Sequence, residues 1–328
     1  MLLDFSGRFD LVRGAQALEL VSGAWHFRRM TPELAEIYAA TDAAVIRALA
    51  TAGVRLVFSA AARRLDAEIE YGRACRQLFK LDLAVDGSEP RAFGPDAAAP
   101  AWSGTLFESG RPARRRFELW LPHCAELGIR RLELDDGAGP EAMPAPAGGT
   151  WLALGDSITQ GMTASRPALT WAARVARELE LDLVNLGVGG AKYDARVGPA
   201  AGRIPARLAT VAFGANDSFQ KVAPAEVERQ AARLIDGLRS RQPELLIAVI
   251  TPIPCFETDG APATGQLDPY RAAARRAAAG RERVRVLEGP ELVPANPELF
   301  IDGVHPNDAG MAAYARNLIP RLKEILGA

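Results

Sequence analysis

The sequence predicts two consecutive folds: an all-β sandwich in the first half of the chain and a three-layer α/β/α domain with a parallel sheet in the second. Three observations predict this arrangement. Apolar residues recur with a period of two in the first half, short apolar runs alternate with helical patterns in the second, and a stretch rich in glycine, proline and alanine lies between them. We therefore expect a β-sandwich over residues 1–137, a linker over residues 138–149 and an α/β domain over residues 150–328.

In the first half, alternation extends over short segments separated by glycine, proline and aspartate turns, which is typical of an all-β sandwich. We expect one short helix within it, over residues 31–40. The apolar members of the alternating segments are Val54, Leu56 and Phe58; Leu65, Ala67, Ile69 and Tyr71; Phe79, Leu81, Leu83 and Val85; and Phe117, Leu119 and Leu121.

Beyond the linker, the apolar runs are continuous and fit strands that are buried on both faces, as in a parallel sheet covered by helices. Function in such sheets gathers at the carboxyl ends of the strands. The expected strands are residues 150–155, 181–187, 207–214, 245–253 and 284–289, and the expected helices are residues 170–180, 224–240, 268–280 and 308–326.

Composition and charge exclude several classes of partner. The chain has 39 basic and 40 acidic residues among 328, so nothing favours nucleic acid. Its three cysteines are widely spaced and its three histidines form no H-x-x-x-H pair, so we expect no disulfide framework, no metal and no other cofactor. The first residues carry acids and no sustained apolar run, so we expect no signal peptide, no membrane partner and a cytoplasmic location. The oligomeric state cannot be predicted from these features.

The expected strand ends and the last loop carry polar residues that suit acyl transfer. The first strand ends on Gly155, Asp156 and Ser157, the second on NLGVGG (185–190) and the third on GAND (214–217), while DGVHPND (302–308) precedes the final helix. Glycines around Ser157 permit a sharp turn and let a substrate approach the backbone. A serine attacks a carbonyl only when a base removes its proton and a third group orients that base.

Asp302 and His305, three residues apart in a turn, can supply the orienting group and the base for Ser157. The attack creates an oxyanion that needs preorganised donors. The Ser157 N–H, a glycine N–H of VGG and the Asn216 amide can provide three such donors. Asp156 and Gly189 lie next to these groups and are possible substrate-binding residues.

These four blocks, in this order, resemble the SGNH or GDSL-type hydrolase superfamily. The resemblance implies Ser157 as nucleophile, Asp302 and His305 as its partners, and Ser157, Gly190 and Asn216 as the oxyanion hole, with Gly189 as the alternative glycine. It implies an SGNH hydrolase fold over residues 150–328. The first block, GDSITQG (155–161), departs from the usual GDSL pattern at Ile158, where leucine is usual.

The first half resembles the jelly-roll-like β-sandwich that precedes this domain in some bacterial esterases, including carbohydrate deacetylases, and in a related acyltransferase. The stretch GAWHFRRMTPE (23–33) carries that impression, and Trp25 and His26 within it are possible contacts for the alcohol part of a substrate. Packing of the sandwich onto the second half is the alternative role for these side chains.

We expect a serine esterase that removes short acyl groups, most simply acetyl, from a small or carbohydrate-like alcohol through an acyl-enzyme. Transfer of the acyl group to another small-molecule acceptor is the alternative among enzymes. A carbohydrate-binding protein with an idle hydrolase domain is the alternative of a different class. A small-molecule or carbohydrate ester is the expected partner in the first two cases.

Overall fold

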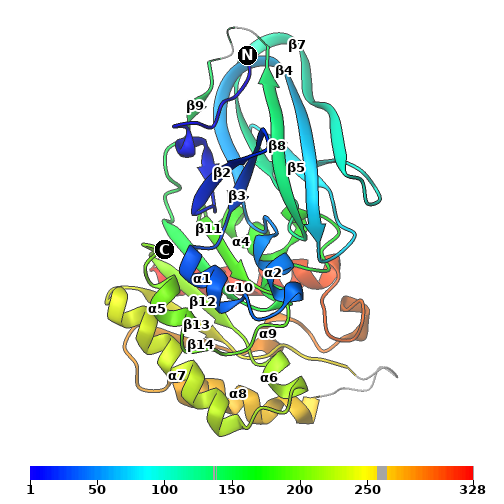
Figure 1. Cartoon of the computed structure of the whole chain (residues 1–328). Coiled ribbons are helices and arrows are strands. Elements are labelled where there is room, and N and C mark those ends of the chain that lie inside the picture. Colours follow the sequence, from blue (N-terminus) through cyan, green and yellow to red (C-terminus); the bar gives the residue numbers. More distant parts are fainter. Residues whose placement is uncertain (136, 138, 257–263, 328) are drawn as a thin grey trace.

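The computed structural model describes residues 1–135, 137, 139–256 and 264–327 and contains two β-sheets. Figure 1 shows the β-rich part above and the α/β part below, with two short helices, α1 (Pro32–Ile37) and α2 (Asp42–Leu49), between them. The described residues include no helix that is both long and apolar enough to cross a membrane.

The second half forms a five-stranded parallel sheet in the order β11-β10-β12-β13-β14. Strand β10 comes first in the sequence but lies second in this order. The chain adds β11 on one side of β10 and then crosses to add β12 on the other side, so the carboxyl ends of the three strands are neighbours. The bounds are β10 Thr150–Gly155, β11 Asp182–Gly187, β12 Leu208–Ala212, β13 Leu246–Ile250 and β14 Val284–Leu287.

Helices cover both faces of this sheet. Leu152 and Val184 face one apolar cluster together with α5, α7 and α8, whereas Trp151 and Leu183 face the other together with α4 and α10. Alternate residues of each strand are thus buried on opposite faces, which explains the continuous apolar runs. The helices are α3 Ser157–Gln160, α4 Trp171–Glu178, α5 Val197–Ala201, α6 Ala215–Phe219, α7 Pro224–Arg241, α8 Thr264–Ala278, α9 Gly289–Leu292 and α10 Asp308–Leu326, with 3-10 turns at Pro167–Leu169 and Pro297–Leu299.

The first half forms an antiparallel sheet whose longest strands bend over one apolar core. The segments expected as separate strands around Val54–Phe58 and Leu65–Tyr71 belong to a single 20-residue strand, β4, because no glycine or proline separates them. Register shifts within β4 accommodate the change of partners along it. The bounds are β1 Val12–Arg13, β2 Ala17–Val21, β3 Ala24–Arg28, β4 Arg55–Ala74, β5 Leu81–Val85, β6 Arg91–Phe93, β7 Ala101–Trp120, β8 Ala125–Leu134 and β9 Glu141–Ala142, with a 3-10 turn at Phe9–Leu11.

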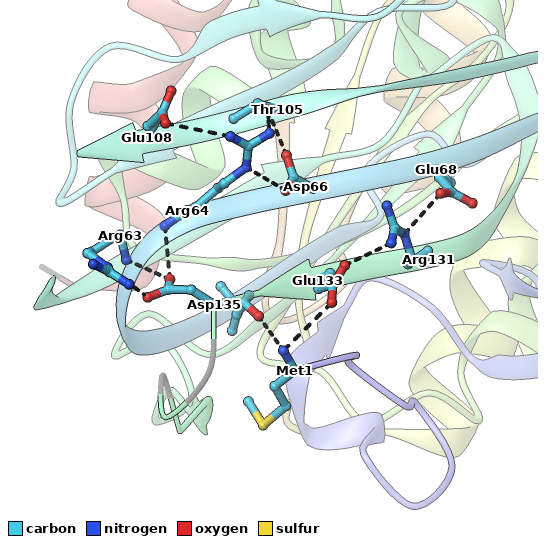
Figure 2. A network of polar contacts seen from close by, with 11 residues as sticks. Met1, Arg63, Arg64, Asp66, Glu68, Thr105, Glu108, Arg131, Glu133 and Asp135 are labelled. Atoms are coloured by element: carbon cyan, nitrogen blue, oxygen red, sulfur yellow. Dashed lines mark hydrogen bonds and ion pairs between the residues drawn. The ribbon is translucent and has the colours of Figure 1, made fainter. Parts of the chain in front are cut away.

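Charged side chains on the outer surface join neighbouring strands of this sheet (Figure 2). Arg64 donates to Asp66 and to Thr105 on β7, both at 2.7 Å, and Arg131 on β8 pairs with Glu68 on β4. These side chains are largely exposed, so the network contributes little to the free energy of folding and chiefly favours one strand register.

The stretch expected as a linker is partly ordered against the sheet. Glu141 and Ala142 form β9, which pairs with Phe58 and Ser59 of β4. Residues 136 and 138 of the glycine-rich stretch lie outside the described residues. The connection therefore follows the surface of the β-rich part before the chain enters β10.

Two short helices of the first half pack on the α/β part. The single helix expected over residues 31–40 is α1, Pro32–Ile37, and a second helix, α2, spans Asp42–Leu49. Thr31 and Thr41 accept hydrogen bonds from the Leu34 and Ala44 N–H groups and thereby start the two helices. Leu34 and other apolar residues of this segment lie in the same cluster as strands β10 and β11, so the segment reaches the end of the parallel sheet.

Candidate active site

Ser157 lies where β10 ends and α3 begins. The Asp156 carboxylate accepts a hydrogen bond from the Ile158 N–H at 2.9 Å and caps α3, while Gly161 ends the helix with a φ of 85°. A Cβ on Gly155 would lie 2.1 Å from the Thr159 hydroxyl oxygen, so this turn requires glycine. The geometry leaves the Ser157 hydroxyl at the carboxyl edge of the sheet.

His305 connects Ser157 to Asp302. The Ser157 Oγ lies 2.8 Å from His305 Nε2, and His305 Nδ1 lies 2.8 Å from Asp302 Oδ2. The Asp302 Oδ1 also accepts the backbone N–H groups of Val304 and His305 at 3.1 and 2.8 Å. The structure thus brings the three predicted catalytic residues together in a continuous hydrogen-bonded chain across 148 positions of sequence.

The same hydrogen bonds determine the charge of Asp302. Burial alone would raise the pKa of this carboxyl, but the bonds from the His305 backbone and ring and from the Val304 N–H outweigh it and hold the pKa below its ordinary value. Asp302 is therefore a carboxylate at neutral pH. A carboxylate in this position holds the proton of His305 on Nδ1 and leaves Nε2 free to accept from Ser157.

The predicted oxyanion donors surround the Ser157 turn. Gly190 is exposed, has a φ of 82°, and its N–H has no hydrogen-bond partner in the described part of the chain. The Gly189 N–H, in contrast, donates to the Gln160 side chain at 3.0 Å. Of the two glycines, Gly190 is the one with an N–H available to a substrate. The Asn216 amide, on α6, donates to the Ala191 carbonyl at 3.1 Å.

Asp156 and Asp217 are buried acids beneath this site. Burial, together with the nearby Asp217 carboxylate, raises the pKa of Asp156 to about 7, and burial raises that of Asp217 to about 6. Asp156 is 3% exposed, and its second oxygen lies 3.4 Å from the Asn216 amide nitrogen. Through its contacts with the Ile158 N–H and the Asn216 amide it shapes the helix start and the position of Asn216.

Trp25 and His26 are not brought to Ser157. The Trp25 ring makes an edge contact with Phe5, with 6.4 Å between ring centres, and His26 Nε2 lies 3.2 Å from Glu70 Oε1. Both partners belong to the first half of the chain, because β3 is held between β2 and β8. These contacts do not support the predicted substrate role of Trp25 and His26.

Two residues at the site were missed in the sequence analysis. Arg47, at the end of α2, donates to the Gly189 carbonyl at 2.9 Å, and the Gln160 side chain accepts from the Gly189 N–H. A Gln three residues after the nucleophile is visible in the sequence, but it carries no chemical signature of its own. Arg47 lies 142 positions from Gly189 in a segment without a catalytic motif, so nothing local in the sequence points to it.

The described residues hold no cluster of three or more histidine, cysteine or acidic side chains suited to a metal ion.

Residues 153–313 match the family model of the GDSL-like lipases and acylhydrolases. These residues form a GDSL-like lipase/acylhydrolase domain. The chain is an enzyme of the serine ester hydrolase class. No curated protein sequence matches it significantly.

Solved structures extend the likeness to almost the whole chain. The salicylyl-acyltransferase of a tetracycline biosynthetic pathway has a TM-score of 0.83 at 23% identity, covering 96% of this chain and 94% of its own. A GDSL-like lipase from Bacteroides ovatus has a TM-score of 0.77 at 19% identity, with 97% and 96% covered. A family two carbohydrate esterase from Cellvibrio japonicus has a TM-score of 0.66 at 17% identity, with 97% and 96% covered. At these identities the likeness shows a shared fold, N-terminal β-rich part included.

Proposed function

We propose that this GDSL-type enzyme is an esterase that removes a short acyl group, such as acetyl, from a small or carbohydrate-like alcohol. The observation that carries the proposal is the unbroken hydrogen-bonded chain from Ser157 through His305 to Asp302. The Asn216 amide and the free Gly190 N–H stand beside that chain at the ends of adjacent strands.

The reaction follows from this geometry. As the Ser157 oxygen attacks the ester carbonyl, its proton passes to His305 Nε2, and the Asp302 carboxylate stabilises the resulting imidazolium. The negative charge that forms on the carbonyl oxygen is stabilised by the Ser157 and Gly190 N–H groups and the Asn216 amide. His305 then gives the proton to the leaving alcohol, and an acyl group remains on Ser157.

Water completes the cycle by the same route. His305 accepts a proton from water as the water oxygen attacks the acyl-Ser157 carbonyl, and it returns that proton to the Ser157 oxygen when the acyl–oxygen bond breaks. The products are a carboxylic acid and the regenerated serine. No other group is needed for the proton balance.

A Cβ on Gly189 would lie 2.4 Å from the Met162 sulfur and 3.1 Å from the Arg47 side chain, so the chain beside Gly190 requires glycine at this position. The length of the acyl group is tested by nitrophenyl esters of increasing chain length. The carbohydrate-like alcohol is supported by the likeness of the whole chain to a carbohydrate esterase.

The test is turnover of a panel of nitrophenyl esters and acetylated sugars by wild type and S157A. The variant should lose activity by roughly 10⁴-fold or more, because nucleophile and base act as a unit. Ser218 is a matched control, since it has the same exposed fraction of 8% as Ser157 but donates to the Gln266 carbonyl. S218A should keep most of its turnover, and an active S157A would contradict the proposal.

Acyl transfer is the second candidate, because the acyltransferase has a TM-score of 0.83 over nearly the whole chain. The two reactions share the acyl-enzyme and differ in what attacks it. Adding increasing concentrations of alcohols should leave the rate of acid release unchanged for a hydrolase. A new ester formed at the expense of the acid would favour the transferase.

The idle-domain alternative is tested by covalent labelling. A fluorophosphonate should attach to Ser157 of the wild-type protein, and S157A should not be labelled. An unlabelled wild type would indicate a binding protein in place of an enzyme.

A further inference from the structure

Arg47 contacts the back of the peptide group that carries the Gly190 N–H. Its guanidinium NH1 donates to the Gly189 carbonyl oxygen at 2.9 Å. The Gly189 carbonyl and the Gly190 N–H belong to the same peptide unit, and the described chain has no cis peptide bond, so the two groups point in opposite directions. A donor on that carbonyl therefore leaves the N–H directed away from Arg47.

The neighbouring peptide is held as well. The Gly189 N–H donates to Gln160 Oε1 at 3.0 Å, and Gln160 Nε2 in turn donates to the backbone carbonyls of Arg47 and His123 at 3.3 and 3.2 Å. Gln160 is fully buried, so it has few alternative orientations. The glycine block is thus fixed on two sides, by the side chain of Arg47 and by a glutamine that Arg47 holds through its backbone.

Arg47 is itself placed by a buried arginine. Arg29 is 1% exposed and donates to the carbonyls of Ala50, Asn185 and Arg47, each at 2.7 Å. Asn185 belongs to β11, so Arg29 joins the end of α2 to the strand that leads into the glycine block. Arg29 therefore holds the backbone of Arg47, and with it the point from which the Arg47 side chain reaches the Gly189 carbonyl.

Within the described residues, no carboxylate lies at ion-pair distance from the Arg47 guanidinium, and the Gly189 carbonyl is the acceptor that its side chain reaches. The Arg47 charge also acts on the Cys75 thiol, whose pKa is lowered first by a hydrogen bond with Cys124 and further by Arg47. A cationic donor on a carbonyl gives a stronger hydrogen bond than a neutral one. It also polarises the peptide, which makes the N–H at the other end a better donor.

We propose that Arg47 is a positioning residue that orients and polarises the Gly189–Gly190 peptide for binding of the oxyanion. This inference rests on the proposed function, since it concerns the transition state of the ester reaction. It gives the β-rich half of the chain a part in catalysis that does not depend on contact with substrate. The effect should appear in kcat and not in KM, because the N–H is needed chiefly when charge develops on the substrate oxygen.

The experiment compares three substitutions of Arg47 with a control at another contact between the same segment and the α/β part. R47M removes the donor, R47Q keeps a neutral donor, and R47K keeps the charge. The control is R203M, because Arg203 pairs with Glu33 of α1 at 2.8 Å and joins the segment to the α/β part away from the glycine block. Turnover of nitrophenyl acetate gives kcat and KM, and inhibition by a boronic acid reports binding of a tetrahedral adduct on Ser157.

We expect R47M to lower kcat by roughly 10- to 100-fold with KM within about 2-fold of wild type. Boronate affinity should fall by a similar factor. R47K should recover most of the loss, R47Q should recover less, and R203M should keep the wild-type kcat. If R47M does not fold, the order of R47K and R47Q carries the test, because both keep a hydrogen-bond donor and only one keeps the charge.

Several results would overturn the inference. These are an R47M kcat within about 2-fold of wild type, a rise in KM at unchanged kcat, equal activities of R47K and R47Q, or an equal loss in R203M. Failure of the proposed function looks different: wild type would then resist fluorophosphonate and S157A would keep its turnover. A labelled wild type and a dead S157A together with a fully active R47M would reject the role of Arg47 alone.

Discussion

Replacing Asp156 by asparagine should change how stability depends on pH. Burial and the neighbouring Asp217 carboxylate raise the pKa of Asp156 from 3.8 to about 7. A carboxyl with a higher pKa in the native than in the unfolded state binds its proton more tightly when folded, so stability falls as pH rises from about 4 through 7. The full shift corresponds to roughly 4 kcal/mol, of which roughly 2–3 kcal/mol is lost between pH 5 and pH 8.

Asparagine at this position keeps the helix cap, since Asn and Asp accept equally well from the N–H at the start of a helix. It has no proton to lose, so the pH-dependent penalty disappears. We expect the free energy of unfolding of D156N, measured in urea, to gain roughly 2–3 kcal/mol over wild type between pH 5 and pH 8. Taking pH 5 as the reference removes any constant difference between the protonated acid and the amide.

Asp66 provides the control. Its pKa is lowered, first by a hydrogen bond from Arg64, so it is ionised in both the native and the unfolded state between pH 5 and pH 8. The difference between D66N and wild type should therefore stay constant over that range. A constant difference for D156N as well would refute the reasoning, because it would mean that Asp156 is charged in the native protein throughout.

Three further predictions concern the reaction. N216A should lower kcat by roughly 10²-fold with little effect on KM, because the amide stabilises charge that forms during the reaction, and a raised KM at unchanged kcat would instead assign Asn216 to substrate binding. The pH profile of kcat/KM should rise with pH and then level off, because the base must be unprotonated to accept from Ser157, and Asp302 should add no limb near neutrality because its pKa is lowered; a flat profile would contradict a histidine base. Trp25→Ala should reduce the melting temperature and act equally on nitrophenyl acetate and on a bulky acetylated sugar, whereas a loss confined to the sugar would restore the recognition role of Trp25.

The site residues that could be predicted from the sequence are those that neighbouring residues identify within a short motif. Ser157 follows an apolar run and is flanked by glycines, and His305 lies three residues after Asp302 in a polar turn. Each role can therefore be predicted from a few consecutive residues. The order of apolar runs and helical patterns likewise predicts the parallel sheet, which places those blocks at one edge.

What could not be predicted depends on contacts between distant segments. Their residue types suggested a substrate role for Trp25 and His26. Because side chains alternate along β3, the Trp25 ring instead contacts Phe5 and the His26 ring lies next to Glu70. No motif surrounds Arg47 in the sequence, and its place depends on Arg29, which donates to the carbonyls of Arg47 on α2 and of Asn185 on β11. A sequence shows the type of each residue, but the contact between Arg47 and Gly189, which are 142 positions apart, arises only when the chain folds.

These contacts bear on what the first half of the chain contributes. If it only selected the alcohol, a chain reduced to residues 144–328 would hydrolyse nitrophenyl acetate at the full rate, because that ester has no sugar to recognise. The contacts predict otherwise. Removing residues 1–143 takes away Arg47 from the Gly189 carbonyl, Arg29 from the Asn185 carbonyl and the His123 carbonyl from Gln160.

Removal of the first half also uncovers apolar surface. Leu34 and Ala48 pack in the cluster on one face of the parallel sheet, and Trp120 packs in the cluster on the other. We expect the shortened chain to lose at least as much kcat on nitrophenyl acetate as R47M, and a separately added fragment of residues 1–143 to restore part of it. Circular dichroism shows whether the parallel sheet is intact. A folded, fully active fragment of residues 144–328 would mean that the contacts to the glycine block serve stability alone.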